Sequence, residues 1–306
     1  MNADTKRATI VEVGPRDGFQ SVLPFIETTT KIRILEQLHS AGVRRVEATS
    51  FVSASAVPQL ADAAEVLAAA QSLPGLDTQV LIPTARHAGN AIAAGARHLV
   101  FVLSVSDRHN RSNVRRTQAE SIEEYRRIVA DLPAEAKIRL NVATAFDCPY
   151  GGAIPESTTI ELLDTLIDIM PSAEIGLCDT TGRVSPSQVG SLFGHAMKRF
   201  PQAGAWAFHA HDTYGLGAAN SLAAWNAGVA VFDASIAGLG GCPFAPGATG
   251  NVATEDLQWM FEGMGIATGL DLAKLVEVAK VTASLPGAQA GGRVRNALRS
   301  RPCEAS

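Results

Sequence analysis

Two histidines end one of the apolar segments of this chain, and their spacing favours metal binding. His209 and His211 are separated by a single residue, so on a strand their side chains point to the same face. Two imidazoles on one face can bind one divalent cation together. Alternatively, one of them is a core histidine with a backbone partner. The next residue, Asp212, alternates to the other face, which predicts a helix cap or a group that orients a ligand.

A guanidinium and a carboxylate are adjacent in a turn near the start of the chain. Residues 14–18 read Gly-Pro-Arg-Asp-Gly after an apolar segment, which predicts a sharp turn that presents Arg16 and Asp17. A carboxylate is a hard ligand suited to Mg²⁺ or Mn²⁺. A guanidinium can stabilise an enolate oxygen as negative charge develops on it. The alternative interpretation is an ion pair on a surface turn.

A glycine-rich segment late in the chain carries one reactive side chain. Residues 238–247 read Gly-Leu-Gly-Gly-Cys-Pro-Phe-Ala-Pro-Gly, which is typical of a loop that approaches a ligand closely or moves as a lid. Cys242 in this loop is a candidate proton shuttle, and a small buried residue is the alternative. Asn251 offers an amide oxygen as a further metal ligand, although it could instead cap the helix predicted to follow it.

Other polar side chains also follow apolar segments. Glu47 alternates with apolar neighbours and could orient Arg16 or act as a base. Asp179 is a candidate catalytic carboxylate, with a plain Asx turn as the alternative. The arginine-rich segment 108–116 is either a solvated face or a contact for an anionic substrate tail such as a phosphate.

These side chains meet only if the segments that carry them belong to one sheet. Short apolar segments alternate with helical stretches, as expected for parallel strands buried on both faces. We therefore predict an α/β fold, a (β/α)₈ TIM barrel with additional C-terminal helices, with a doubly wound open sheet as the alternative. The predicted strands are Thr9–Val13, Arg45–Ala48, Gln79–Ile82, His98–Leu103, Ile138–Ala143, Glu174–Cys178, Ala205–His209 and Val231–Ile236. In such a barrel the chemistry lies at the carboxyl ends of the strands.

The domain organisation and composition narrow the function further. We expect residues 1–290 to form a single catalytic barrel with its C-terminal helices, and residues 291–306 to form a loose tail. The 306 residues carry a net charge of −4, which argues against nucleic-acid binding. No apolar stretch approaches the ~20 residues that span a membrane. A polar start without an apolar signal core and four scattered cysteines predict a cytoplasmic protein with free thiols.

Four separated motifs occur in an order typical of one enzyme family. They are Val11–Gly18, Val46–Ser53, His209–Gly215 and the segment Val229–Asp256 around Gly-Gly-Cys-Pro-Phe. These motifs resemble those of the 3-hydroxy-3-methylglutaryl-CoA (HMG-CoA) lyases of the DRE-TIM metallolyase superfamily, and the similarity extends over nearly the whole chain. The resemblance implies a divalent-metal-dependent retro-Claisen cleavage of HMG-CoA to acetyl-CoA and acetoacetate.

The resemblance also implies individual roles and partners. It implies an acyl-CoA substrate and a homodimer or higher homo-oligomer. The base for the substrate hydroxyl stays open between His209, Asp179 and a hydroxide on the metal. The implied ligands of Mg²⁺ or Mn²⁺ are Asp17, His209, His211 and Asn251. The implied catalytic residues are Arg16 facing the thioester carbonyl, Cys242 as the acid/base of the loop, and His209, Glu47 and Asp179; Arg16, Gln20 and Gly241 are the expected substrate contacts.

Departures from the family pattern lie near the expected substrate entrance. Ser21–Pro24 follows Gln20 where the lyases usually show Asn-Glu and often Lys, and the segment 104–117 is unusually rich in arginine. A lyase for a related 3-hydroxy-3-alkyl acyl-CoA is therefore an alternative. A Claisen-condensing synthase of the same superfamily would lack the Gly-Gly-Cys-Pro loop. A non-catalytic acyl-CoA-binding barrel would not need four metal ligands.

Overall fold

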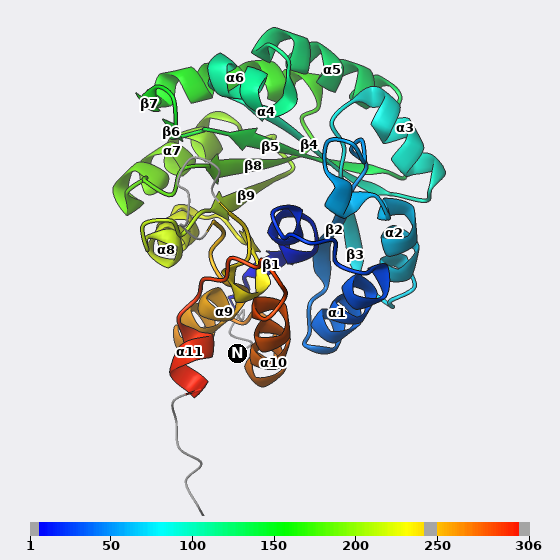
Figure 1. Cartoon of the computed structure of the whole chain (residues 1–306). Coiled ribbons are helices and arrows are strands. Elements are labelled where there is room, and N and C mark those ends of the chain that lie inside the picture. Colours follow the sequence, from blue (N-terminus) through cyan, green and yellow to red (C-terminus); the bar gives the residue numbers. More distant parts are fainter. Residues whose placement is uncertain (1–5, 242–249, 300–306) are drawn as a thin grey trace, which may run out of the picture.

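Eight parallel strands close into a barrel in the computed structural model, which describes residues 6–241 and 250–299. Around the barrel the order is β1-β10-β9-β8-β5-β4-β3-β2, and the helices form an outer ring (Figure 1). The predicted barrel is therefore confirmed, and the open sheet is excluded. The strands are β1 (Thr9–Glu12), β2 (Arg45–Ser50), β3 (Asp77–Leu81), β4 (His98–Ser104), β5 (Lys137–Ala143), β8 (Glu174–Asp179), β9 (Ala205–Ala210) and β10 (Val231–Ala234).

The predicted strands all occur, with ends that shift by a few residues. β2 continues to Ser50, beyond the predicted end at Ala48. β10 ends at Ala234 instead of Ile236 because a 3₁₀ turn, η3 (Ile236–Gly238), follows at once. Ala237 in this turn has a φ of 58°, a left-handed backbone conformation that is incompatible with an extended strand.

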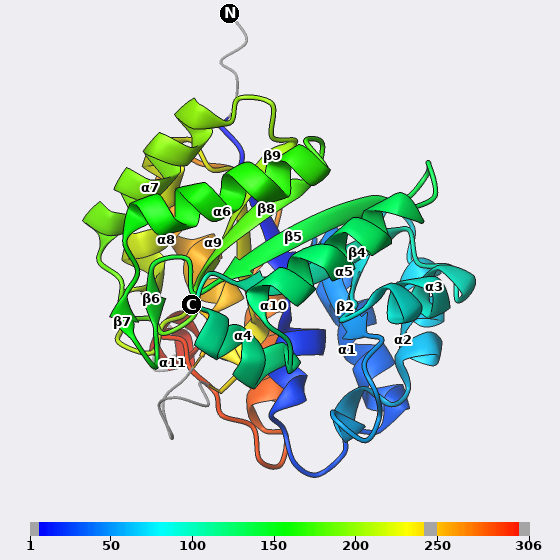
Figure 2. The same ribbon diagram turned by 90° about the horizontal axis from the view of Figure 1, so that it is seen from above.

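The outer helices follow the strands in turn, and two short additions lie at one end of the barrel. The helix α4 (Asp107–Val114) follows β4, and the hairpin of β6 (Asp147–Cys148) and β7 (Gly152–Ala153) follows β5; Figure 2 shows them at the same end. The remaining helices up to the last strand are α1 (Thr28–Ser40), α2 (Ala63–Gln71), α3 (Ala85–Ala93), α5 (Gln118–Ala130), α6 (Glu156–Ile169), α7 (Pro186–Arg199) and α8 (Gly217–Ala227).

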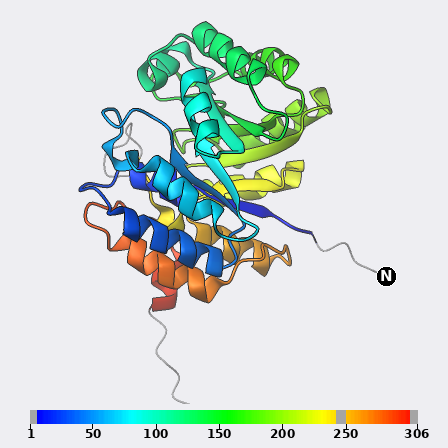
Figure 3. The ribbon, with the colours of Figure 1, turned by 90° about the vertical axis from the view of Figure 1, so that its right-hand side faces the viewer.

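In the described ranges three α-helices follow the last strand; the sequence predicted additional C-terminal helices, but not the last of these three, which lies where a loose tail was expected. α9 (Thr254–Gly263) closes the ring, and α10 (Leu272–Ala283) packs beside α1 (Figure 3). The last, α11 (Val294–Arg299), contacts α9 and α10. None of the helices in the described ranges is long and apolar enough to cross a membrane.

The start of the expected loose tail is attached to the barrel. The Gly291 amide donates to the Ala237 carbonyl at 2.8 Å, and the Arg293 amide donates to Asp256 Oδ2 at 2.8 Å. These contacts and α11 make the expectation of a loose tail wrong for residues 291–299. Residues 300–306 lie outside the described ranges.

The barrel interior contains a buried ion pair between β5 and β10. Arg139 donates from both terminal nitrogens to the two oxygens of Asp233, each at 2.8 Å. Its Nε donates to Asn141 Oδ1 at 2.8 Å. Gly176 on β8 leaves the space for this arrangement, since a Cβ there would lie 2.3 Å from Asn141 Oδ1 and 3.0 Å from an Arg139 nitrogen.

The Gly176→Ala substitution should therefore destabilise the protein. We expect the free energy of unfolding to fall by about 1–3 kcal/mol, because the added methyl group forces buried polar side chains apart. Denaturant unfolding followed by circular dichroism measures this. The control is Gly89→Ala in α3, where an added Cβ meets no atom within 4 Å and helix propensity favours alanine. Equal stability of the two variants would contradict the role of Gly176.

Candidate active site at the barrel mouth

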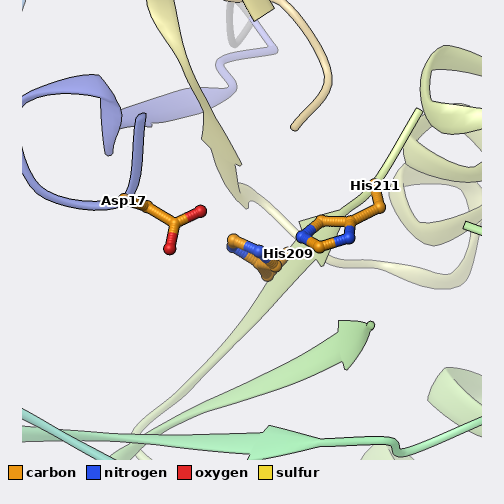
Figure 4. Close-up of side chains that lie close together, drawn as sticks. All are labelled: Asp17, His209 and His211. Atoms are coloured by element: carbon orange, nitrogen blue, oxygen red, sulfur yellow. The ribbon is translucent and has the colours of Figure 1, made fainter. Parts of the chain in front are cut away.

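Asp17, His209 and His211 form a cluster at the carboxyl ends of β1 and β9. One carboxylate oxygen and one nitrogen of each ring all lie within 4.8 Å of one another. His209 belongs to β9, His211 follows that strand, and Asp17 lies in η1 (Gly14–Gly18), the turn after β1. Figure 4 shows the carboxylate facing the His209 ring, with His211 beyond it. The structure thus confirms the prediction that these three side chains lie close together.

Asn251, which follows the glycine-rich segment in the sequence, contacts Asp17 of the cluster. Its Nδ2 donates to Asp17 Oδ2 at 2.6 Å and to the Leu239 carbonyl at 3.0 Å. Asn251 does not cap the following helix, because Ala253 occupies the N-cap position of α9. The capping alternative is therefore excluded.

Two buried acceptor atoms of these side chains are without hydrogen bonds. Asn251 Oδ1 and His211 Nδ1 have no partner within the described part of the chain. A buried acceptor without a partner is costly. A divalent cation would satisfy both, and a carboxylate, two imidazoles and an amide oxygen suit Mg²⁺ or Mn²⁺. The residues present therefore fit a cation site.

The charges around the cluster favour the protonation states that a metal needs. Burial alone would raise the pKa of Asp17, but the charges of Arg16 and His209 hold that pKa well below its usual value. Burial, together with the neighbouring His209, lowers the pKa of His211 to about 4. At neutral pH Asp17 is consequently an anion and His211 is neutral, as metal ligands must be.

Arg16 is held in place by two carboxylates. Its Nε and one terminal nitrogen donate to the two oxygens of Glu47 on β2, at 2.9 and 3.0 Å. The other terminal nitrogen donates to Asp17 Oδ1 at 2.5 Å. Glu47 was predicted either to orient Arg16 or to act as a base, and this bidentate contact supports the orienting role.

Glu12 anchors the turn that carries Arg16 and Asp17, and the sequence reasoning missed it. Its Oε1 accepts from the amides of Gly14 at 2.7 Å and Ile236 at 2.8 Å, and its Oε2 accepts from Thr254 Oγ1 at 2.6 Å. Burial raises the pKa of Glu12 to about 7. A carboxylate inside an otherwise apolar strand was the available signal. Through Glu12, η1 is joined to η3 and α9.

Asp179 has the contacts of a loop anchor. It accepts from the Gly182 amide at 2.8 Å and lies 3.5 Å from Asn220 Nδ2. Burial raises its pKa to about 6, although hydrogen bonds from backbone amides of the following loop oppose the rise. These contacts match the Asx-turn alternative, and the catalytic role of Asp179 stays a prediction.

Asp212 accepts a hydrogen bond from the first turn of α8, which is close to the predicted helix-cap role, although Leu216 occupies the N-cap position. Its Oδ1 accepts from the Gly217 amide at 2.7 Å, where α8 begins. Because this carboxylate turns away to α8, the cluster receives only the two histidines from this segment.

The remaining predicted residues lie around the mouth or outside the described ranges. Gln20 is exposed. Gly241 lies beside Ser21 and Gln289, whose Oε1 would be 3.1 Å from a Cβ at this glycine. Cys242 lies outside the described residues, and its predicted role stays a prediction.

The arginine-rich segment mostly contacts its own surroundings. Arg108 lies over the Tyr150 ring at 4.8 Å, Arg111 pairs with Asp107 at 2.7 Å, and Arg116 donates to the Pro83 carbonyl at 2.8 Å. These contacts account for part of the positive charge of the segment. A contact with an anionic substrate tail stays a prediction.

Curated relatives of this chain include HMG-CoA lyases. The family model described as HMGL-like matches residues 7–282. The mitochondrial hydroxymethylglutaryl-CoA lyase of Homo sapiens is 42% identical over 278 residues, which cover 90% of this chain and 85% of that protein. The cytoplasmic 3-hydroxy-3-methylglutaryl-CoA lyase of Rattus norvegicus is 40% identical over 269 residues, covering 88% and 78% of the two chains.

Solved structures show the same similarity. The HMG-CoA lyase of Bacillus subtilis superposes with a TM-score of 0.91 at 37% identity, covering 96% of this chain and 99% of that one. The HMG-CoA lyase of Acinetobacter baumannii, in complex with coenzyme A and 3-methylmalate, gives a TM-score of 0.90 at 37% identity, covering 100% and 99%.

The cluster geometry predicts that Asp17→Asn weakens cation binding. The substitution removes the anionic ligand, so we expect at least about a tenfold lower affinity for Mn²⁺, by analogy with other changes at metal sites. Isothermal titration of the metal-stripped protein with Mn²⁺ measures this. Asp107→Asn is the matched control, because Asp107 is exposed on α4 and pairs with Arg111. Unchanged affinity in Asp17→Asn would remove Asp17 from the site.

Proposed function

This chain belongs to the HMGL-like family, and from that premise we propose that its barrel mouth cleaves HMG-CoA to acetyl-CoA and acetoacetate. The observation that carries the proposal is the convergence of Asp17, His209 and His211 next to a guanidinium fixed by Glu47. A non-catalytic binding barrel has no need of this combination. The relatives and structural neighbours described above are lyases, which favours a lyase over a condensing synthase as the function of this chain.

The cation site would be filled by Mg²⁺ or Mn²⁺, held by Asp17, His209, His211 and Asn251. When bound, such an ion supplies Lewis acidity that lowers the pKa of the tertiary hydroxyl of the substrate. The described residues offer such an ion the ionised carboxylate of Asp17, the neutral imidazole of His211 and the buried amide oxygen of Asn251, which has no hydrogen-bond partner among them.

Arg16 is proposed to stabilise the charge that develops on the thioester. When the hydroxyl loses its proton, the bond between C2 and C3 breaks, C3 becomes the ketone of acetoacetate, and the electron pair moves onto the thioester as an enolate. A guanidinium whose orientation is fixed before the reaction stabilises that oxygen at no cost of reorganisation. The contacts with Glu47 and Asp17 provide this fixed orientation.

Two proton transfers complete the proposed reaction. Asp179 is a weaker candidate for the base of the hydroxyl, because its carboxylate accepts backbone amides of the following loop. His209 has no lone pair left for the hydroxyl proton when its Nδ1 donates to Asp233 and its Nε2 is a cation ligand, so in this proposal the proton passes to a hydroxide. Protonation of the enolate carbon by Cys242 then gives acetyl-CoA, so that atoms and charges balance.

We also propose the finer properties of the protein. An acyl-CoA substrate is supported by the coenzyme A in the A. baumannii structure. The exposed Leu23 and Phe25 follow Gln20 where the family often carries a lysine, which supports tests with related 3-hydroxy-3-alkyl acyl-CoA esters. A homodimer or higher homo-oligomer follows from the resemblance, and a cytoplasmic location is supported by the name of the rat relative.

Release of acetoacetate from HMG-CoA in the presence of Mg²⁺ or Mn²⁺ tests the proposal. We expect cleavage by the wild-type protein, none after EDTA treatment, and a rate about 10²- to 10⁴-fold lower in Cys242→Ala, the range typical of a lost general acid. Cys303→Ala, which removes a thiol outside the Gly-Gly-Cys-Pro loop, should cleave at the wild-type rate. A metal-loaded wild-type protein that releases no acetoacetate would exclude HMG-CoA as the substrate.

A further inference from the structure

His209 has a hydrogen-bond partner inside the barrel that determines which of its nitrogens carries a proton. Its Nδ1 lies 3.0 Å from Asp233 Oδ2, and both side chains are buried. The two residues are register partners on the adjacent strands β9 and β10, so their side chains lie on the same face. A carboxylate accepts hydrogen bonds, so Nδ1 is the donor, and in the neutral ring the lone pair is on Nε2.

The lone pair of His209 is thereby available to the cluster. With Nδ1 used by Asp233, Nε2 is the nitrogen left for a ligand. Figure 4 shows the His209 ring between Asp17 and His211, with the carboxylate facing it. In the opposite tautomer Nε2 would carry a hydrogen and could not bind a cation.

Asp233 is itself immobilised by Arg139. The guanidinium donates to both carboxylate oxygens at 2.8 Å, and the Arg139 side chain is 1% exposed. Arg139 is fixed in turn by Asn141 on its own strand and by Glu174, 3.5 Å away. The carboxylate consequently cannot rotate away from His209 without breaking a bidentate ion pair in a buried environment.

We propose that Asp233 and Arg139 are positioning residues of the cation site: Asp233 holds His209 in the tautomer that offers Nε2, and Arg139 holds Asp233. Neither residue is among the three that form the cluster. The inference rests on the proposed function only in taking Asp17, His209 and His211 as ligands of a divalent cation. It predicts that an acceptor at position 233 matters for the affinity of the site for metal.

Two double variants separate this role from a contribution to stability. Arg139→Met/Asp233→Leu replaces the ion pair by apolar side chains and leaves His209 Nδ1 without an acceptor. Arg139→Gln/Asp233→Asn also removes both charges, but an amide oxygen at position 233 can still accept from Nδ1. Removing both partners together avoids an unpaired buried charge, which would destabilise the fold.

Mn²⁺ titration of the metal-stripped proteins is the first measurement. We expect the apolar double variant to bind Mn²⁺ about 10- to 100-fold more weakly than wild type, as is typical when the partner of a ligating histidine is lost. The amide double variant should bind clearly more tightly than the apolar one. Equal, wild-type affinity in both folded variants would overturn the proposal. The matched control is Asp77→Asn, which alters an Asp–His contact of 2.9 Å between β3 and β4 at the opposite end of the barrel and should leave Mn²⁺ affinity unchanged.

Nuclear magnetic resonance of histidine side chains gives a second measurement that needs neither metal nor the two double variants. In the wild-type protein labelled with ¹⁵N-histidine, and assigned by comparison with His209→Gln, the His209 signals should be those of the tautomer protonated on Nδ1. Protonation on Nε2 alone would overturn the proposal. These two readouts do not involve HMG-CoA, so a protein that binds Mn²⁺ as expected but fails to cleave HMG-CoA would contradict the proposed function and not this inference.

Discussion

Buried arginines of this barrel are shielded from water and pair with carboxylates on other strands. Arg139 on β5 pairs with Asp233 on β10, and Arg16 after β1 pairs with Glu47 on β2. The partners of these pairs lead directly to the cluster, because Asp233 contacts His209 and Arg16 contacts Asp17. The requirement to pair buried charges therefore fixes the orientation of a candidate metal ligand and of the candidate electrophile at the same time.

Barrel closure is what brings the two halves of the site together. β1 and β9 are separated by nearly 200 residues of sequence, yet each pairs with β10, so their carboxyl ends open onto the same mouth. Glu12 joins the turn after β1 to the segment after β10, and Asn251 reaches Asp17 from beyond the glycine-rich loop. The candidate ligand atoms are thus arranged by the fold itself, and a preorganised site would lose little entropy on binding a cation.

The sequence predicted much of this architecture because the relevant signals are local. Apolar segments between helical stretches located all eight strands. The side chains of His209 and His211 were predicted to share a face because side chains alternate along a strand. Glu12, Arg139 and Asp233 were not predicted. Each is a charged residue within a strand, and its partner is known only once the strands are ordered in space: Arg139 and Asp233 are 94 residues apart. The attachment of residues 291–299 depends likewise on contacts with α9 and η3 that no local pattern reveals.

We expect a divalent cation to bind between the turn after β1 and the end of β9. A crystal structure of the Mn²⁺-loaded protein, with data collected at the manganese absorption edge, shows whether it does, because the anomalous signal locates the ion independently of its neighbours. We expect one strong anomalous peak within coordination distance of Asp17, His209, His211 and the oxygen of Asn251. A Mn²⁺-loaded crystal whose strongest peak lies elsewhere, with this cluster filled only by water, would contradict it.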